Sequence, residues 1–211
     1  MKKIILSLIY PLCVRQFLRL IMGVHYVNRE ILRGAEQFII VSNHNSHLDT
    51  MALMAALSWR QIDRTKPVAA GDYFGKTPIK KRITELFVNA LLIPRSRPKE
   101  GETFADPIQL MVNALGAGHS LIIFPEGTRG EAGKIQKFKK GIGLVAQQCP
   151  HVPIIPVFMQ GMGKLLPKGE MLLVPFDNFV RFGTPFYCGD LPVEDIVARV
   201  EKEIMALAEV Q

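Results

Sequence analysis

A histidine and an aspartate with four residues between them form the first group in this chain that could carry out chemistry. His44 and Asp49 lie in the polar stretch Ser42-Asn43-His44-Asn45-Ser46-His47-Leu48-Asp49. A neutral imidazole can take a proton from a hydroxyl near pH 7. A carboxylate on its other ring nitrogen would fix the tautomer and stabilise the imidazolium that forms. The pair therefore suits general-base catalysis on a substrate hydroxyl, without a serine or cysteine nucleophile.

Two other interpretations of this pair remain open. In the first, the stretch is a capped loop in which His44 only satisfies backbone groups. In the second, His44, His47 and Asp49 are ligands of a metal-dependent hydrolase. The two histidines are only three positions apart and no further ligand cluster is visible, so we expect no metal and no cofactor. His47 is then an exposed loop residue or one that supports the catalytic pair.

The elements around the pair are predicted from short apolar runs. Residues 38–41 are β-branched and aromatic, which indicates a buried strand, and residues 51–57 are helix formers. His44 and Asp49 are thus expected on a strand-to-helix loop. Further strands are predicted at 67–70, 90–93, 121–124, 154–158 and 180–182, and helices at 78–87, 107–117 and 192–208. Alternating strands and helices predict a single α/β domain.

A second polar group follows the predicted strand at 121–124. It is the turn Phe124-Pro125-Glu126-Gly127-Thr128-Arg129. Gly127 allows the backbone to approach a ligand closely, and the Arg129 guanidinium has a planar fork suited to phosphate. Arg95 also follows a predicted strand, so both arginines could lie at one edge of the sheet. Either arginine alone would be read as a surface residue, but two beside a general base describe a pocket for a phosphorylated alcohol.

The overall charge and the N-terminal segment point to a membrane surface. The 211 residues carry a net charge of +7, and the mean hydropathy is +0.18. Aromatic residues do not interleave with basic ones, so we expect no nucleic-acid partner. Residues 1–26 are expected to form a membrane-associating helical segment with snorkelling Arg15 and Arg19, and residues 27–211 the main domain. The alternative is an amphipathic helix packed on the core.

The expected location follows from the same segment and from the cysteines. The apolar run near the N-terminus is too short to span a bilayer, which predicts peripheral or monotopic association. Cys13, Cys149 and Cys188 form no Cys-x-x-Cys pair and are odd in number, so we expect free thiols in a reducing compartment. Together these features predict a protein on the cytoplasmic face of an anionic membrane.

Four short blocks of the chain resemble the glycerophospholipid acyltransferases, and most of all the 1-acylglycerol-3-phosphate acyltransferases. The blocks occur in the order of that family and cover about residues 38–158. They are Asn43-His44-x4-Asp49, Leu92-Ile93-Pro94-Arg95, Phe124-Pro125-Glu126-Gly127-Thr128-Arg129 and Val152-Pro153-Ile154-Ile155-Pro156-Val157. Four matching blocks in order make the resemblance specific, although each of the first two is weak alone.

The resemblance implies a reaction, a site and a fold. The reaction is transfer of an acyl chain from acyl-CoA or acyl carrier protein to a lysophospholipid or glycerol phosphate, in phospholipid biosynthesis. His44 would be the base and Asp49 its partner. The acceptor and its phosphate would be bound by Arg95, Glu126, Gly127, Thr128 and Arg129. The fold would be a mixed sheet flanked by helices. The alternatives are an acyltransferase for another membrane acceptor and a non-catalytic basic membrane-binding protein of the same fold.

The chain departs from the family pattern at four places. Asn89 stands where glycine is usual, Pro94 where an acidic residue is common, and Gly130 where serine is frequent. Many members also have a lysine in the stretch equivalent to 68–74, whereas here the nearest are Lys66 and Lys76. These differences bear on the identity of the acceptor.

Overall fold

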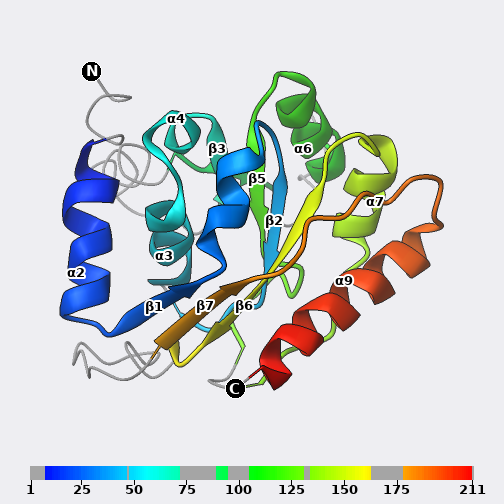
Figure 1. Ribbon diagram of the computed structural model, residues 1–211. Coiled ribbons are helices and arrows are strands. Elements are labelled where there is room, and N and C mark those ends of the chain that lie inside the picture. Colours follow the sequence, from blue (N-terminus) through cyan, green and yellow to red (C-terminus); the bar gives the residue numbers. More distant parts are fainter. Residues whose placement is uncertain are drawn as a thin grey trace.

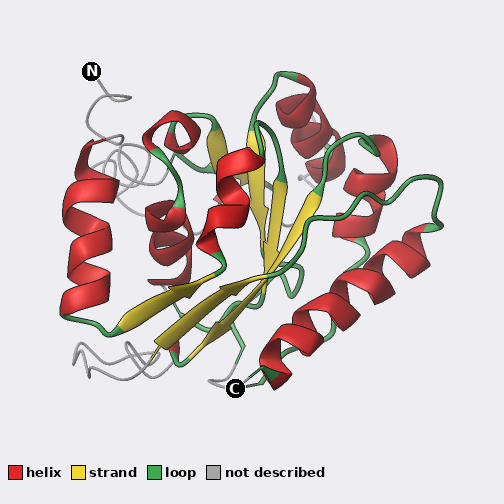
Figure 2. Cartoon of the chain, in the orientation of Figure 1, coloured by secondary structure: helices red, strands yellow, loops and turns green. Residues whose placement is uncertain are grey.

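A mixed sheet runs through the middle of the molecule, between two layers of helices (Figures 1 and 2). The structure is a computed structural model that describes residues 8–46, 48–71, 89–94, 105–130, 134–162 and 178–210. Within these ranges the strand order is β1-β7-β6-β2-β5-β3-β4. All neighbours are parallel except β6 and β7. The strands are β1 (Val24–Val27), β2 (Ile39–Ser42), β3 (Thr65–Ala70), β4 (Leu91–Ile93), β5 (Ser120–Ile123), β6 (Ile154–Gln160) and β7 (Asn178–Phe182).

The central strands are buried on both faces, which explains their uninterrupted apolar sequences. In β2, Ile40 packs into one core and Ile39 and Val41 into the other, because successive side chains of a strand point to opposite faces. The first core is covered by η1 (Tyr10–Val14), α2 (Arg15–Leu20), η2 (Arg29–Gly34), α3 (Leu48–Ala56) and α4 (Trp59–Ile62). The second is covered by α6 (Pro107–Gly116), α7 (Gly141–Gln148) and α9 (Val193–Glu209). The prediction of a single α/β domain is therefore confirmed.

Most predicted elements within the described residues are present. Strands β2 to β7 lie within a few residues of their predicted positions, and α6 starts as expected, with the Asp106 carboxylate accepting from Ile108 N at 2.9 Å. The predicted helix at 78–87 lies outside the described residues. One detail was wrong: α3 begins at Leu48, so Asp49 lies in its first turn and not on the preceding loop. The elements β1, η2, α4 and α7 were not predicted.

The N-terminal helical segment packs against the first core. Tyr10, Leu18 and Met22 are buried there. The prediction that Arg15 snorkels toward solvent was wrong. Its Nε and Nη2 donate to Ala55 O and Leu57 O, at 2.5 and 2.6 Å. The opposite side of the segment exposes large apolar side chains, namely Leu8, Leu12, Phe17, Leu20 and Ile21. Among the described helices none is long and apolar enough to cross a membrane.

Candidate functional site

The predicted catalytic pair meets where β2 leads into α3. His44 lies two residues after the end of β2. Its Nδ1 is 2.9 Å from Asp49 Oδ2. The Asp49 side chain is completely buried, whereas 19% of the His44 side chain is exposed. The imidazole can therefore meet a substrate while its carboxylate partner is kept from solvent.

Backbone donors hold the Asp49 carboxylate in place. Oδ2 also accepts from Asn45 N at 2.7 Å and from Ser46 N at 2.8 Å. The carboxylate lies at the N-terminal end of α3, where the helix dipole stabilises negative charge. A carboxylate only accepts, so this arrangement requires His44 Nδ1 to donate. The lone pair of the neutral imidazole is then on Nε2, the nitrogen that faces away from Asp49.

Two further contacts orient the histidine. The ring of Phe124 stacks on the imidazole, with ring centroids 4.1 Å apart and an angle of 18° between the planes. Asn43 fixes the backbone just before His44, because its side-chain amide exchanges two hydrogen bonds with the backbone of Met159 in β6, at 2.9 and 2.8 Å. The ring and the loop that carries it are thus positioned from β5 and β6.

Glu126 joins the loop that carries His44 to the chain before α7. Its side chain is buried, and its two carboxylate oxygens accept from His44 N at 2.9 Å and Gln136 N at 3.1 Å. A third bond, from Gly130 N to His44 O at 3.0 Å, ties the same turn to the same residue. Burial raises the pKa of Glu126, although the two backbone donors act in the opposite direction. Glu126 therefore fixes the position of His44 through its backbone.

Gly127 lies under the side chain of Lys139, which the sequence interpretation had not singled out. Gly127 has a φ of 72°, a left-handed conformation that favours glycine. A Cβ at this position would come within 2.5 Å of Lys139 Nζ. Lys139 N also donates to Pro125 O at 2.9 Å, which fixes the lysine on this turn. Among the described residues, no hydrogen-bonding or ionic partner meets the Lys139 ammonium group.

The remaining predicted site residues divide into those that the structure describes and those that it does not. Thr128 is exposed on the turn and Arg129 is half-buried beside it. Arg95 and His47 lie outside the described residues. Strands β4 and β5 both run parallel to β3, so β4 ends at the same edge of the sheet as the turn after β5. In the described part of the chain, no three side chains of the metal-ligating types come together.

Two departures from the family pattern have a structural explanation. Asn89 has a φ of 52°, and asparagine tolerates this left-handed conformation better than most other residues. Its amide also donates to Asp63 O at 3.1 Å. At Gly130 a Cβ would lie 3.2 Å from Lys134 O and 3.3 Å from Glu126 Oε2. The absence of a side chain at Gly130 therefore lets the chain after it approach the Glu126 turn.

Comparison with known proteins shows the family of this chain. Residues 23–160 match the Acyltransferase family, and this stretch is more than half of the chain. The chain belongs to that family. It is 31% identical to a chloroplastic 1-acyl-sn-glycerol-3-phosphate acyltransferase of Brassica napus, over 71% of this chain and 40% of the relative. It is also 31% identical to a 1-acyl-sn-glycerol-3-phosphate acyltransferase of Limnanthes douglasii, over 75% of this chain and 53% of the relative.

A solved structure of this acyltransferase family has the same fold. The crystal structure of the 1-acyl-sn-glycerophosphate acyltransferase PlsC from Thermotoga maritima superposes with a TM-score of 0.78, at 25% identity. The match covers 99% of this chain and 80% of the other. By contrast, the chain spans only about half the length of the curated relatives that it matches. The mixed sheet flanked by helices is thus the shared structure.

Proposed function

We propose that this acyltransferase moves an acyl chain from acyl-CoA or acyl carrier protein to the free hydroxyl of 1-acylglycerol-3-phosphate or a related lysophospholipid. The observation that carries the proposal is the contact of His44 Nδ1 with Asp49 Oδ2, which leaves Nε2 as a base. The relatives named above act in their printed names on 1-acyl-sn-glycerol-3-phosphate. Their chemistry needs a base for one hydroxyl and a site for one phosphate, and this chain has candidates for both.

The proton follows a simple path in this mechanism. His44 Nε2 takes the proton of the acceptor hydroxyl while Asp49 stabilises the imidazolium through Nδ1. The acceptor oxygen attacks the thioester carbonyl carbon and gives a tetrahedral intermediate. The C–S bond then breaks, and the imidazolium returns its proton to the leaving thiolate. The products are an ester and a free thiol, and no covalent acyl-enzyme is needed.

The acceptor phosphate is assigned to the cations around the Glu126 turn. Arg129 and Arg95 were expected from the sequence, and Lys139 joins them because its ammonium group lies over Gly127. Gly127 and Thr128 would border the phosphate, whereas Glu126 acts by holding the His44 backbone. Charge-assisted contacts of this kind orient the acceptor so that its hydroxyl faces His44 Nε2.

The substrate is a membrane lipid, and we propose that the protein works at a membrane surface. The exposed apolar side of the N-terminal segment supports this proposal, with Leu12, Phe17 and Leu20 pointing out of the core. An amphipathic segment of this type can lie in the interface without crossing it. The net charge of +7 favours an anionic surface.

Thiol release from purified full-length protein tests the function. Acyl-CoA and acyl carrier protein thioesters are offered with lysophosphatidic acid, lysophosphatidylcholine, lysophosphatidylglycerol or glycerol 3-phosphate. Release that requires lysophosphatidic acid and is lost in His44→Ala supports the proposal. Release with another lysophospholipid only would make that lipid the acceptor. No release with any pair would indicate a membrane-binding protein that lacks catalysis.

A further inference from the structure

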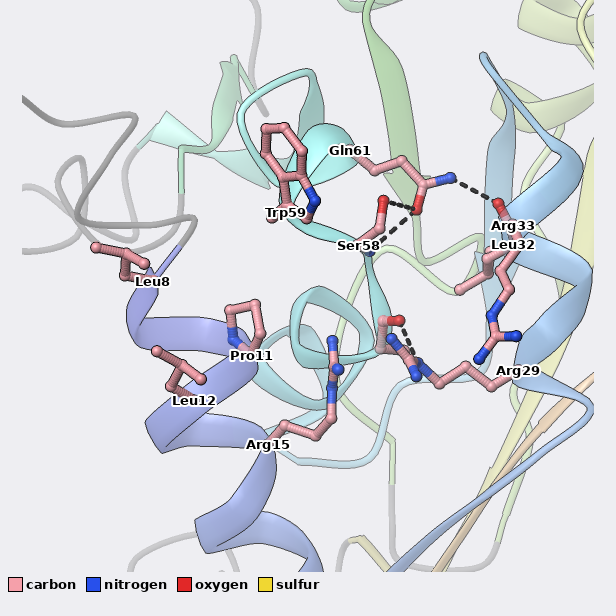
Figure 3. A pocket seen from close by; sticks show the side chains of 11 residues that line it. Leu8, Pro11, Leu12, Arg15, Arg29, Leu32, Arg33, Ser58, Trp59 and Gln61 are labelled. Carbon is pink, nitrogen blue, oxygen red and sulfur yellow. Dashed lines mark hydrogen bonds between the residues drawn. The ribbon is translucent and has the colours of Figure 1, made fainter.

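A pocket lies at the far end of α3, away from the catalytic pair. Asp49 is in the first turn of α3, and Ala56 at its last residue lines this pocket. Ala56 follows Asp49 by seven positions, or about 10 Å along the helix at 1.5 Å per residue. The pocket has a volume of about 460 Å³ (Figure 3). Its lining includes Leu12, Arg15, Arg29, Arg33, Trp59 and Gln61.

The pocket concentrates positive charge. Arg15 comes from α2, and Arg29 and Arg33 come from η2. Figure 3 shows Arg15 and Arg29 reaching the end of α3 from two sides, with Arg33 next to Arg29. No carboxylate is among the described residues that line the pocket. Burial and then the nearby Arg29 lower the pKa of Arg15 to about 10. Burial also lowers the pKa of Arg29, with Tyr26 acting in the opposite direction and Arg33 and Arg19 in the same direction.

Structural hydrogen bonds use only some of the guanidinium donors. Arg15 Nε and Nη2 donate to Ala55 O and Leu57 O, and Arg29 Nε donates to Ala56 O. These bonds cap the C-terminal end of α3. Each guanidinium has five N–H donors, so both residues keep donors for another acceptor. Arg33 makes no hydrogen bond or ion pair with any described residue. An anion in the pocket would meet unused donors and relieve the repulsion.

The rim of the pocket is apolar and exposed. Leu12 is 65% exposed and Trp59 is 60% exposed. Both line the pocket, and α2 beside it also exposes Phe17 and Leu20. A free phosphate ion has no apolar part that could contact this rim. A phospholipid would place its phosphate on the arginines and its glycerol and first methylenes against Trp59 and Leu12.

We propose that the pocket between α2, η2 and α4 binds the headgroup of one anionic membrane phospholipid. The lipid is held apart from the acceptor at His44, because it sits at the opposite end of α3. Its role is to place the protein on anionic membrane and to fix the side of α2 that meets the bilayer. The inference rests on the membrane association proposed above and names its lipid class and residues.

Trp59 is the single tryptophan of the chain, so its fluorescence reports directly on this pocket. The full-length protein is titrated with vesicles of phosphatidylcholine or of phosphatidylcholine with phosphatidylglycerol. The proposal expects a blue shift that needs far less lipid when phosphatidylglycerol is present, and quenching by lipids brominated near the headgroup. If the fluorescence shift needed the same amount of lipid with both kinds of vesicle, the protein would still bind membranes, but the proposal of an anionic-lipid pocket would be overturned. No binding to either would overturn both, and a response to inorganic phosphate alone would assign a free-anion site and overturn the lipid proposal.

Paired variants separate a pocket from diffuse attraction. Arg33→Gln removes a cation of the pocket, and Lys202→Gln removes one exposed cation from α9 on the other side of the sheet. Arg33→Gln should need about five-fold more anionic lipid for half-maximal binding, and Lys202→Gln about the same as the unchanged protein. In vesicle co-sedimentation, Trp59→Ala should weaken binding while Tyr187→Ala, whose side chain is equally exposed at 61%, should not. Equal losses within either pair, or no loss in Arg33→Gln, would contradict the proposal.

Discussion

Both ends of α3 are capped by hydrogen bonds from or to charged side chains, but the two ends differ in how many polar groups are left without a partner. At the first turn, the carboxylate of Asp49 accepts from the N–H groups of Asn45 and Ser46. At the last turn, the carbonyls of Ala55, Ala56 and Leu57 accept from Arg15 and Arg29. Each end thus has the charge that the helix dipole favours there.

The two ends of α3 differ in which side-chain hydrogen-bonding groups remain unused. At the His44 end, both oxygens of Glu126 and the ring nitrogen Nδ1 of His44 are engaged, so Nε2 is the imidazole nitrogen left for the proposed chemistry. At the arginine end, several cations lie together with unused donors. The proposed base is held in a single orientation, whereas the proposed anion-binding pocket keeps uncompensated charge. The predictions below change each end in turn.

The largest effect is expected from His44→Ala. Without the imidazole no group is left to take the hydroxyl proton, so kcat should fall by about three orders of magnitude or more. The variant should keep its melting temperature, because His44 lies on a loop at the edge of the core. Thiol release measures kcat, and thermal unfolding measures the melting temperature.

Asp49→Asn and His47→Ala check the assignment of roles within the loop. An amide at position 49 can favour the wrong imidazole tautomer, so Asp49→Asn should also be severe, with some residual turnover from positioning. His47→Ala should be mild. Full activity in His44→Ala together with an inactive His47→Ala would move the base to the other histidine.

A smaller effect is expected from the cations of the proposed phosphate site. Arg129→Ala, Lys139→Ala and Arg95→Ala should each raise the acceptor KM and change the donor KM less. The loss of one charge-assisted contact costs about 1.5–3 kcal/mol, or one to two decades in kcat/KM. Lys140→Ala is the matched control, since this neighbouring lysine is paired with Glu194 at 2.7 Å. A change confined to the donor KM would place these residues in the acyl-donor site.

The residues of the candidate site and the arginines at the far end of α3 differ in how far the sequence could predict them. The spacing of His44 and Asp49 and the block at 124–129 have recognisable patterns, and the strands β2, β5 and β6 are apolar because both faces are buried. Lys139 belongs to a basic run far along the chain, and only folding shows that its ammonium group lies over Gly127. The role of Arg15 has no sequence signal either, because its partners are backbone carbonyls.

The missed helices have physical reasons of their own. Helix α7 contains Gly141 and Gly143, which lower helix propensity. Gly143 is required by packing, since a Cβ there would lie 2.6 Å from Val193 O at the start of α9. Helix α4 is four residues long and is set by a capping box between Ser58 and Gln61. Both elements depend on contacts and caps that hydrophobic periodicity does not contain.

At the arginine end, Arg15→Met should lower stability without touching the chemistry. Methionine keeps much of the apolar contact but leaves Ala55 O and Leu57 O without their donor. The free energy of unfolding should fall by about 2 kcal/mol, measured by denaturant titration. Arg19→Met on the same helix is the control, because Arg19 makes no hydrogen bond to the described residues. An equal loss in both variants would mean that charge and not helix capping is responsible.

The smallest effect is expected between the two ends, at Tyr26. Its hydroxyl donates to Ala52 O in the middle of α3 at 3.1 Å, so Tyr26→Phe should cost about 1 kcal/mol of stability at pH 7 and leave turnover unchanged. Burial raises the pKa of Tyr26 above its ordinary 10.0, against the lowering effect of Arg15, Arg29 and Arg19. Above pH 10 the unfolded chain therefore releases a proton that the folded protein keeps, and stability falls as pH rises. Tyr26→Phe has no phenol to ionise, so the difference in the free energy of unfolding between the variant and the unchanged protein should become smaller above pH 10. Denaturant titrations at pH 7 to 11 measure this difference. A difference that grew with pH would contradict the burial of a protonated phenol beside α3.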